Sequence, residues 1–299
     1  MTDREERSME FGAHFANFAY PEPDRAIALC TAAERVGFDF AVTIEHVVWP
    51  TDYDSPYPYS PSGKLPGGPE TNLPDPLIWM AHAAAHTERL RFMTGVLILP
   101  QRNPLIVAKQ VASLDYLSNG RIELGIGVGW LEEEFDALGV PFARRGKRTD
   151  EYIEAMRVLW TQDDAGYDGE FVNFQQMNCN PKPVQARLPI IIGGHSELAA
   201  RRAGRLGDGF FPATGWAGDR GPLLELVRDE AIAHGRDPGD IRITTGLDPD
   251  DPVDSTLRVA EQGFHRVVVN SALFSDDLAG ELERFGAEVI APVREKLGG

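Results

Sequence analysis

The pattern of apolar residues along the chain is clearest between residues 89 and 130. Residues 90–99 form a run rich in aliphatic side chains, which predicts a strand buried on both faces. Asn103 then offers an N-cap for a helix, and Gly120 is suited to end that helix. A second buried strand is predicted over residues 121–126. Strand, helix and strand in this order are typical of parallel α/β folds, which bind ligands at the carboxyl ends of their strands.

Similar apolar runs recur along the whole chain and alternate with amphipathic helical segments. Eight alternating βα units in 299 residues predict a single (β/α)₈ TIM barrel with insertions, spanning 1–299. A doubly wound sheet with a small second domain is the alternative. A final helix is expected over 276–296. The eight predicted strands cover residues 9–18, 38–44, 90–99, 121–126, 189–192, 209–212, 241–247 and 266–269.

Three segments fall outside this alternation. Residues 1–8 form a polar tail, and residues 163–188 form an insertion that is expected to carry two short strands over 167–177. Residues 47–74 show no periodicity and contain seven prolines and four aromatic residues. Loops of this length are often lids or binding loops, and this one leaves the carboxyl end of a predicted strand. We therefore expect a lid over the barrel mouth, with a solvated insertion as the alternative.

Composition narrows the class of protein. The net charge of −17 argues against nucleic acid and anionic membranes as partners. Cys30 and Cys179 show no metal-ligand spacing, which favours a reducing compartment. No apolar run approaches the length of a membrane span, and residues 1–7 do not resemble a signal peptide. A cytoplasmic globular protein is expected.

Candidate catalytic chemistry lies at the end of the second predicted strand, where Glu45 and His46 stand side by side. A histidine at the carboxyl end of a barrel strand can give or take a proton near neutral pH. A structural histidine that is hydrogen-bonded to its own loop fits the spacing equally well. His82 and His86 lie four residues apart on a predicted helix, but without a protease-type glutamate, so no metal site is expected.

Glycines mark two further strand ends. Gly125, Gly127 and Gly129 precede Trp130, and this spacing is not the dinucleotide fingerprint. Glycines there permit close approach of the backbone to a flat or anionic ligand. Gly193 and Gly194 precede Ser196 at the start of a predicted helix, where free amides suit a phosphate. Tight βα turns also need glycine, so the spacing alone leaves both interpretations open.

Four stretches together resemble the bacterial luciferase-like superfamily of flavin and deazaflavin oxidoreductases. They cover most of the chain, and the match is best with the branch of coenzyme F420-dependent oxidoreductases. The stretches are GFDFAVTIEH (37–46), the segment beginning TGVLILPQRNP (94–130), RRGKRTDEYIEAMRVLW (144–160), and the segment beginning PIIIGGHSE (189–215).

The resemblance implies a TIM barrel and a set of site residues. His46, beside Glu45, would be the proton donor or acceptor next to the cofactor ring. A non-prolyl cis peptide between Gly95 and Val96 would back that ring. The remaining positions that the resemblance assigns to cofactor binding are Val128, Gly129, Trp130, Glu134, Gly193, Gly194, Ser196 and Thr214.

The resemblance also implies the chemistry and the partners. With coenzyme F420 the reaction would be hydride transfer to or from a small organic substrate. With FMN it would be oxygen-dependent monooxygenation, with a separate flavin reductase as partner. A flavin-binding protein without catalytic activity is the alternative from another class. A homodimer is expected, and the substrate stays open because no sugar-phosphate site is evident.

Overall fold

The computed structural model describes residues 9–58, 60, 62–212, 220–274 and 277–298. Its eight main strands pair in parallel and close into a barrel, because β1 pairs with both β2 and β11, and β3 pairs with β5. This confirms the predicted (β/α)₈ fold. The strands are β1 (Glu10–His14), β2 (Phe40–Thr43), β3 (Arg91–Thr94) with its continuation β4 (Leu97–Ile98), β5 (Ile122–Gly127), β8 (Ile190–Gly193), β9 (Gly209–Phe211), β10 (Arg242–Gly246) and β11 (Arg266–Asn270).

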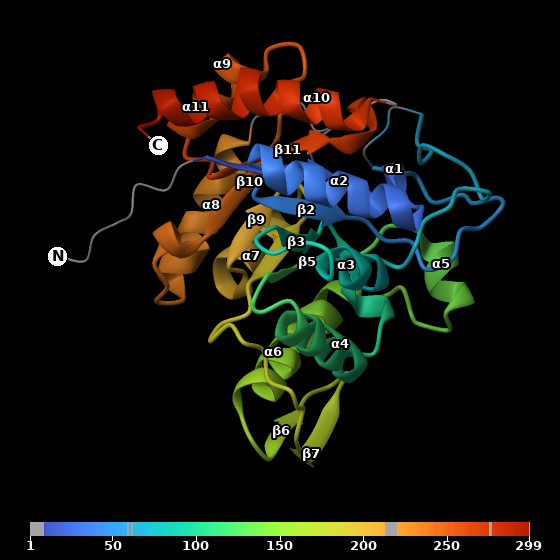
Figure 1. Cartoon of the computed structure of the whole chain (residues 1–299). Helices are drawn as coiled ribbons and strands as arrows, with labels where there is room; N and C mark the ends of the chain where they lie inside the picture. The colour runs from blue at the N-terminus through green and yellow to red at the C-terminus, as the bar shows by residue number, and fades with distance from the viewer. Residues whose placement is uncertain (1–8, 59, 61, 213–219, 275–276, 299) are drawn as a thin grey trace.

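Helices surround the barrel in the order that the sequence predicts (Figure 1). The helix expected after Asn103 begins there, since the Asn103 side chain accepts hydrogen bonds from the first helical amides, and Asp75 caps α3 in the same way. The helices are α1 (Ala16–Ala19), α2 (Pro23–Val36), α3 (Pro76–Ala84), α4 (Pro104–Leu117), α5 (Glu132–Ala137), α6 (Arg145–Thr161), α7 (Glu197–Leu206), α8 (Gly221–Ala233), α9 (Pro252–Glu261), α10 (Leu278–Phe285) and α11 (Ala291–Lys296).

Three predicted elements are corrected by the structure. The strand predicted over 9–18 ends at His14, because Phe15 adopts a left-handed conformation and α1 begins. The strand predicted over 90–99 is split into β3 and β4 by a cis peptide between Gly95 and Val96. The final helix contains a π-helical segment, Gly286–Ile290, between α10 and α11. Backbone conformation at single residues decides all three, and apolar periodicity does not report it.

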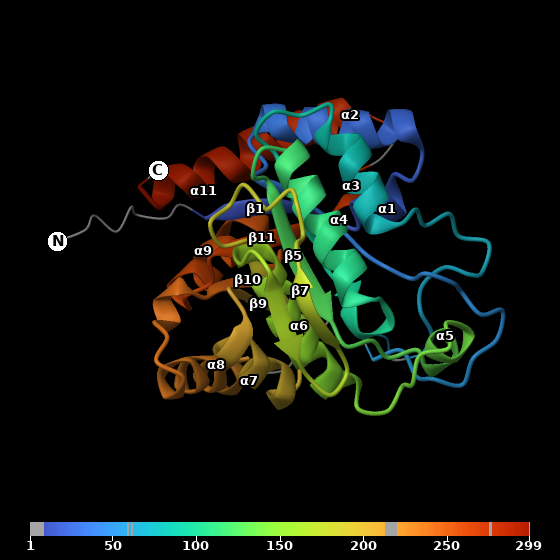
Figure 2. The same ribbon diagram turned by 90° about the horizontal axis from the view of Figure 1, so that it is seen from below.

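Two segments project from the barrel. β6 (Ala165–Asp168) and β7 (Asn173–Met177) form the antiparallel hairpin that was expected in the insertion, and it lies beyond α6 in Figure 1. Residues 47–74 contain no helix or strand in their described part and extend toward α5 (Figure 2). Across the described residues, no helix combines the length and apolar composition needed to cross a membrane.

The amino-terminal end of the barrel interior is filled by a cluster of charged side chains. Glu123 on β5 and Arg266 on β11 form a buried ion pair, with 2.8 Å between Glu123 Oε1 and Arg266 Nη2. Arg91 donates a second hydrogen bond to Glu123 at 3.0 Å, and Glu10 pairs with both Arg91 and Arg266. Burial alone would raise the pKa of Glu123, but the guanidinium groups of Arg266, Arg91 and Arg242 together outweigh burial and hold it at about 2. These ion pairs join strands from opposite sides of the barrel.

Replacing Glu123 with glutamine is expected to lower the free energy of unfolding by about 3–5 kcal/mol, because Arg266 would stay buried without its main counter-charge. The folded-state pKa of about 2 lies below the ordinary carboxyl value of 4.5. The stabilisation is therefore complete above that value and is lost as the pH falls toward 2. Chemical denaturation at pH 7 and at pH 3 measures both effects, and the difference between variant and wild type should shrink at pH 3.

Glu170→Gln is the matched control, because Glu170 also pairs with an arginine, Arg144, but on the exposed surface. Its stability at pH 7 should stay close to that of the wild type. Equal stability of the Glu123 and Glu170 variants would contradict the role of the buried cluster.

Candidate functional site

A cavity of about 440 Å³ opens at the carboxyl ends of the barrel strands. His14, Ile44, Gly95, Gly127, Gly193, Phe211 and Asn270 line it from seven positions around the barrel mouth, and the loop of residues 47–74 contributes a further wall. Its lining includes every residue predicted for the site except Glu134, which lies buried behind His46, and Thr214, which lies outside the described residues.

His46 is held in place by a buried carboxylate. Its Nδ1 atom lies 2.9 Å from Glu134 Oε2, and the Glu134 side chain is fully buried. The other oxygen, Oε1, accepts the amides of Val47 at 2.5 Å and Val48 at 3.3 Å. A carboxylate can only accept hydrogen bonds, so we assign the proton of His46 to Nδ1. Nε2 is then the acceptor that remains for chemistry.

Glu45 has a different environment from its neighbour. Its carboxylate accepts the Ile98 amide at 2.5 Å and the Arg102 Nε at 2.6 Å, and Arg102 also binds Asp75 at 2.6 Å. Burial raises the pKa of Glu45, and the Arg102 guanidinium opposes that shift. Both oxygens are thus engaged in joining β2, β4 and the start of α3. This arrangement gives Glu45 a positioning function, and its predicted catalytic role stays a prediction.

The interruption between β3 and β4 forms a ridge in the cavity wall, and two predicted glycines make room for it. A Cβ atom at Gly127 would lie 2.6 Å from Val96 Cγ2, and one at Gly193 would lie 2.4 Å from Val96 Cγ1. Gly125 faces the Thr94 carbonyl, which would lie 1.7 Å from a Cβ atom. Close backbone approach was predicted toward a ligand. The structure shows it toward Val96 and the neighbouring strand, so these glycines shape the surface on which a ligand lies.

Aromatic side chains form the wall opposite the ridge. Trp130 makes edge contacts with His46, Tyr53 and Tyr57, at centroid distances of 5.9, 5.7 and 5.2 Å. The loop is tied to α5 by Glu133, whose carboxylate accepts the amides of Asp54 at 2.7 Å and Ser55 at 3.2 Å. The loop lines one side of the cavity through Trp49, Tyr57, Pro58, Leu65 and Pro66, and its function as a lid stays a prediction. Its residues Tyr59 and Pro61 lie outside the described residues.

The predicted phosphate position lies at the start of α7. Ser196 caps this helix and its Oγ accepts the amide of Ala199 at 3.2 Å. Among the hydrogen bonds of the described residues, none engages the amides of Glu197 and Leu198. Open amides at a helix start favour an anion, and Gly194 at φ 120° brings the backbone to the cavity.

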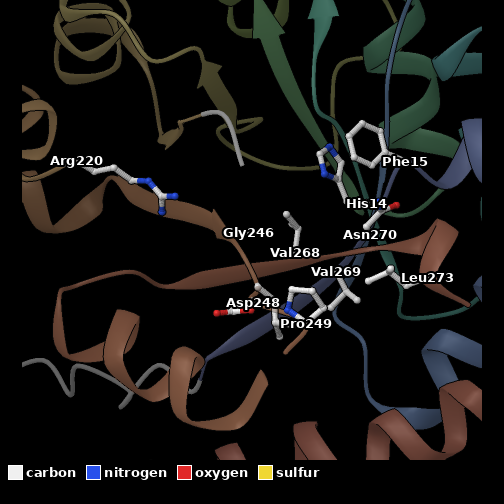
Figure 3. A pocket seen from close by; sticks show the side chains of 11 residues that line it. His14, Phe15, Arg220, Gly246, Asp248, Pro249, Val268, Val269, Asn270 and Leu273 are labelled. Atoms are coloured by element: carbon white, nitrogen blue, oxygen red, sulfur yellow. The ribbon is translucent and has the colours of Figure 1, made fainter. Parts of the chain in front are cut away.

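A second cavity of about 410 Å³ adjoins the first, and the two share His14, Phe15 and Asn270 in their linings. Figure 3 shows it between His14 on one side and Arg220 on the other. His14 is the last residue of β1. The strand predicted over 9–18 continues past it, so nothing in the sequence placed His14 at a strand's carboxyl end.

The chain matches the family described as luciferase-like monooxygenase over residues 9–269. An uncharacterized protein of Mycobacterium tuberculosis is 35% identical over 271 residues, which cover 89% of this chain and 95% of the relative. The F420-dependent glucose-6-phosphate dehydrogenase of Segniliparus rotundus is 32% identical, covering 76% of this chain and 66% of that protein.

Two further matches differ in the cofactor that their names give. The FMNH2-dependent dimethylsulfone monooxygenase of Pseudomonas putida is 34% identical, covering 53% of this chain and 45% of that protein. The structure of the coenzyme F420-dependent tetrahydromethanopterin reductase of Methanopyrus kandleri superimposes with a TM-score of 0.78 at 18% identity. That match covers 96% of this chain and 99% of the reductase, and it shows a common fold.

Glu134→Gln is expected to switch the tautomer of His46. The glutamine oxygen can still accept the amides of Val47 and Val48, so its NH₂ group must face Nδ1. Nδ1 then becomes an acceptor, and the proton moves to Nε2. The ¹⁵N chemical shifts of the His46 ring in histidine-labelled protein measure this directly.

Glu133→Gln provides the control, because Glu133 binds the amides of Asp54 and Ser55 and has no described contact with His46. The His46 tautomer should be the same in this variant as in the wild type. An unchanged tautomer in the Glu134 variant would show that Glu134 does not set the proton position.

Proposed function

The chain belongs to the luciferase-like monooxygenase family, and from this membership we propose that it is a coenzyme F420-dependent oxidoreductase acting on a small organic substrate. Homologues in this family use either F420 or FMN. The relative from Segniliparus rotundus and the reductase from Methanopyrus kandleri, both F420-dependent, support the choice of F420.

The observation that carries the proposal is the His46–Glu134 pair facing an aromatic cavity. Glu134 holds the imidazole with Nε2 available as a proton acceptor, and Trp49 and Trp130 flank the ring. The loop that carries Trp49 lines the same cavity. A base that is fixed in a largely apolar pocket suits proton transfer coupled to oxidation or reduction of an organic molecule.

The cavity fits a tricyclic cofactor with a phosphate. Val96 provides a ridge between Gly127 and Gly193 on which a flat ring can lie, and the open amides of α7 suit the phosphate. When bound, F420 supplies the hydride acceptor or donor. His46 accepts the substrate proton when a hydride leaves the substrate and returns it in the reverse direction. Glu134 stabilises the imidazolium that forms.

An FMN-dependent monooxygenase is the second candidate, favoured by the Pseudomonas putida relative. It would require molecular oxygen and a separate flavin reductase. In that reaction His46 would instead protonate or orient an oxygenated substrate.

Titration of the purified protein with F420 and with FMN, each oxidised and reduced, tests the proposal. Fluorescence should report micromolar binding of F420 and weaker binding of FMN. Preference for reduced FMN would replace the proposal with the monooxygenase. If neither bound, both cofactor assignments would be wrong.

His46→Ala is expected to lower kcat by about 10²-fold, the usual contribution of a general acid or base, while the Kd for the cofactor changes little. Turnover across a panel of ketones, enones and secondary alcohols measures the effect. His82→Ala on the outer face of α3 is the control and should retain full turnover. A wild-type protein that binds cofactor but turns over no panel compound would favour a non-catalytic flavin-binding protein.

We also propose a homodimer formed through outer helices. Ile78 on α3 is 66% exposed, and Ile106 and Leu117 on the neighbouring α4 are 58% and 80% exposed. A second copy of the chain could cover these apolar side chains across a two-fold axis. A sedimentation mass of one chain at micromolar concentration would contradict this.

A further inference from the structure

His14 is a buried polar side chain that the proposed chemistry leaves unused. It ends β1, is 5% exposed, and lines both cavities at their junction. Its ring stacks on Phe15 at a centroid distance of 3.9 Å and leans against Phe211 at 5.4 Å. Within the described residues, its Nε2 atom is buried without a hydrogen-bond partner.

A buried nitrogen of this kind is costly in the free protein. An unsatisfied buried acceptor destabilises the folded state, and a ligand that supplies the missing partner recovers that free energy. Burial lowers the pKa of His14 to about 4, and the contact with the Gly95 backbone opposes this only in part. The ring is thus neutral near pH 7 and carries one N–H, which faces the Gly95 carbonyl. The unpartnered Nε2 is then an acceptor, which suits an uncharged hydroxyl group.

The surroundings of His14 select the rest of such a ligand. Phe15, Val268, Val269 and Leu273 give the second cavity apolar walls beside His14, and Asn270 and Asp248 add polar groups to the same lining. Arg220 lies across from His14 in Figure 3, where its guanidinium donates to Thr245 Oγ1. The two cavities adjoin at His14, Phe15 and Asn270, which belong to both linings.

We propose that the second cavity is a substrate subsite, and that His14 accepts a hydrogen bond from an uncharged hydroxyl group of the substrate, remote from the carbon that is oxidised or reduced. This rests on the proposed function, because it places the reacting end of the substrate beside the cofactor and His46. His14 is then a specificity residue, distinct from the proton-transferring His46.

Two probes of similar size test the proposal in protein saturated with its cofactor. Cyclohexanone carries one oxygen, and 4-hydroxycyclohexanone carries a second one at the far side of the ring. Dissociation constants, measured by the change in cofactor fluorescence, require no turnover. The wild type should bind 4-hydroxycyclohexanone about tenfold more tightly than cyclohexanone, in line with about 1.4 kcal/mol for one added hydrogen bond.

Two variants assign that preference to His14. His14→Phe keeps a ring that can stack on Phe15 but removes both nitrogens, and it should bind the two probes equally. His14→Gln keeps a polar group near the position of Nε2 and should retain part of the preference. Both variants should bind the cofactor as the wild type does, which also shows that they fold.

Each result decides between outcomes. Equal affinity of the wild type for the two probes, or an unchanged preference in His14→Phe, would overturn the subsite; a nitrogen that serves only a cavity water gives this result. Weaker cofactor binding in His14→Phe would make His14 a cofactor contact and would also overturn it. If the wild type bound neither F420 nor FMN, the proposed function would fail and the subsite with it, whereas normal cofactor binding without discrimination would remove the subsite alone.

Discussion

The site depends on the hydrogen bonds that the buried Glu134 carboxylate accepts. One oxygen accepts a hydrogen bond from Nδ1–H of His46, and the other accepts hydrogen bonds from the Val47 and Val48 amides of the loop. A single carboxylate thus determines the orientation and the tautomer of the imidazole and the position of Val47 and Val48, where the loop begins. Because the group is fully buried, its partners cannot exchange with water without leaving a charge unsatisfied. The position of the His46 ring and the position of the start of the loop are therefore coupled through the Glu134 side chain.

The barrel separates stability from chemistry along its axis. At the amino ends of the strands, Glu123 and Arg266 form a buried ion pair inside the barrel. Above it, Phe40, Val42, Met93, Ile191, Phe211 and Val268 pack as an apolar layer inside the barrel. At the carboxyl ends the same interior opens into two cavities. There His46 is hydrogen-bonded to Glu134 of α5, and Glu45 is hydrogen-bonded to Arg102. The packed amino-terminal half of the barrel stabilises the fold, so the loops at the carboxyl ends can form the site without contributing most of the stability.

Two glycines at strand ends lie in the cavity wall, but the group that approaches them closely differs from the predicted one. Gly127 was selected because glycine at a strand end permits close approach of the backbone, and Gly193 because it precedes a helix start that suits a phosphate. They do lie in the cavity wall, but the group that approaches them is Val96 of the neighbouring strand. The sequence distance between residues 96, 127 and 193 hides this contact. Val96, at the interruption of the third strand, occupies the space that the missing side chains of Gly127 and Gly193 leave.

Alternating apolar runs, helix caps at Asp75 and Asn103, and turn glycines were sufficient to derive the barrel, since each depends on contacts within a few residues. The same local logic located His46 and the start of α7 at strand ends. It could not show that Glu134, 88 residues away, binds His46, or that Arg102 engages Glu45, because both contacts form only when the barrel closes. Nor could it single out His14, whose buried nitrogen gains meaning only from the two cavities around it. The chain's periodicity determined the scaffold, and tertiary packing decided which polar groups on it are paired and which face a ligand.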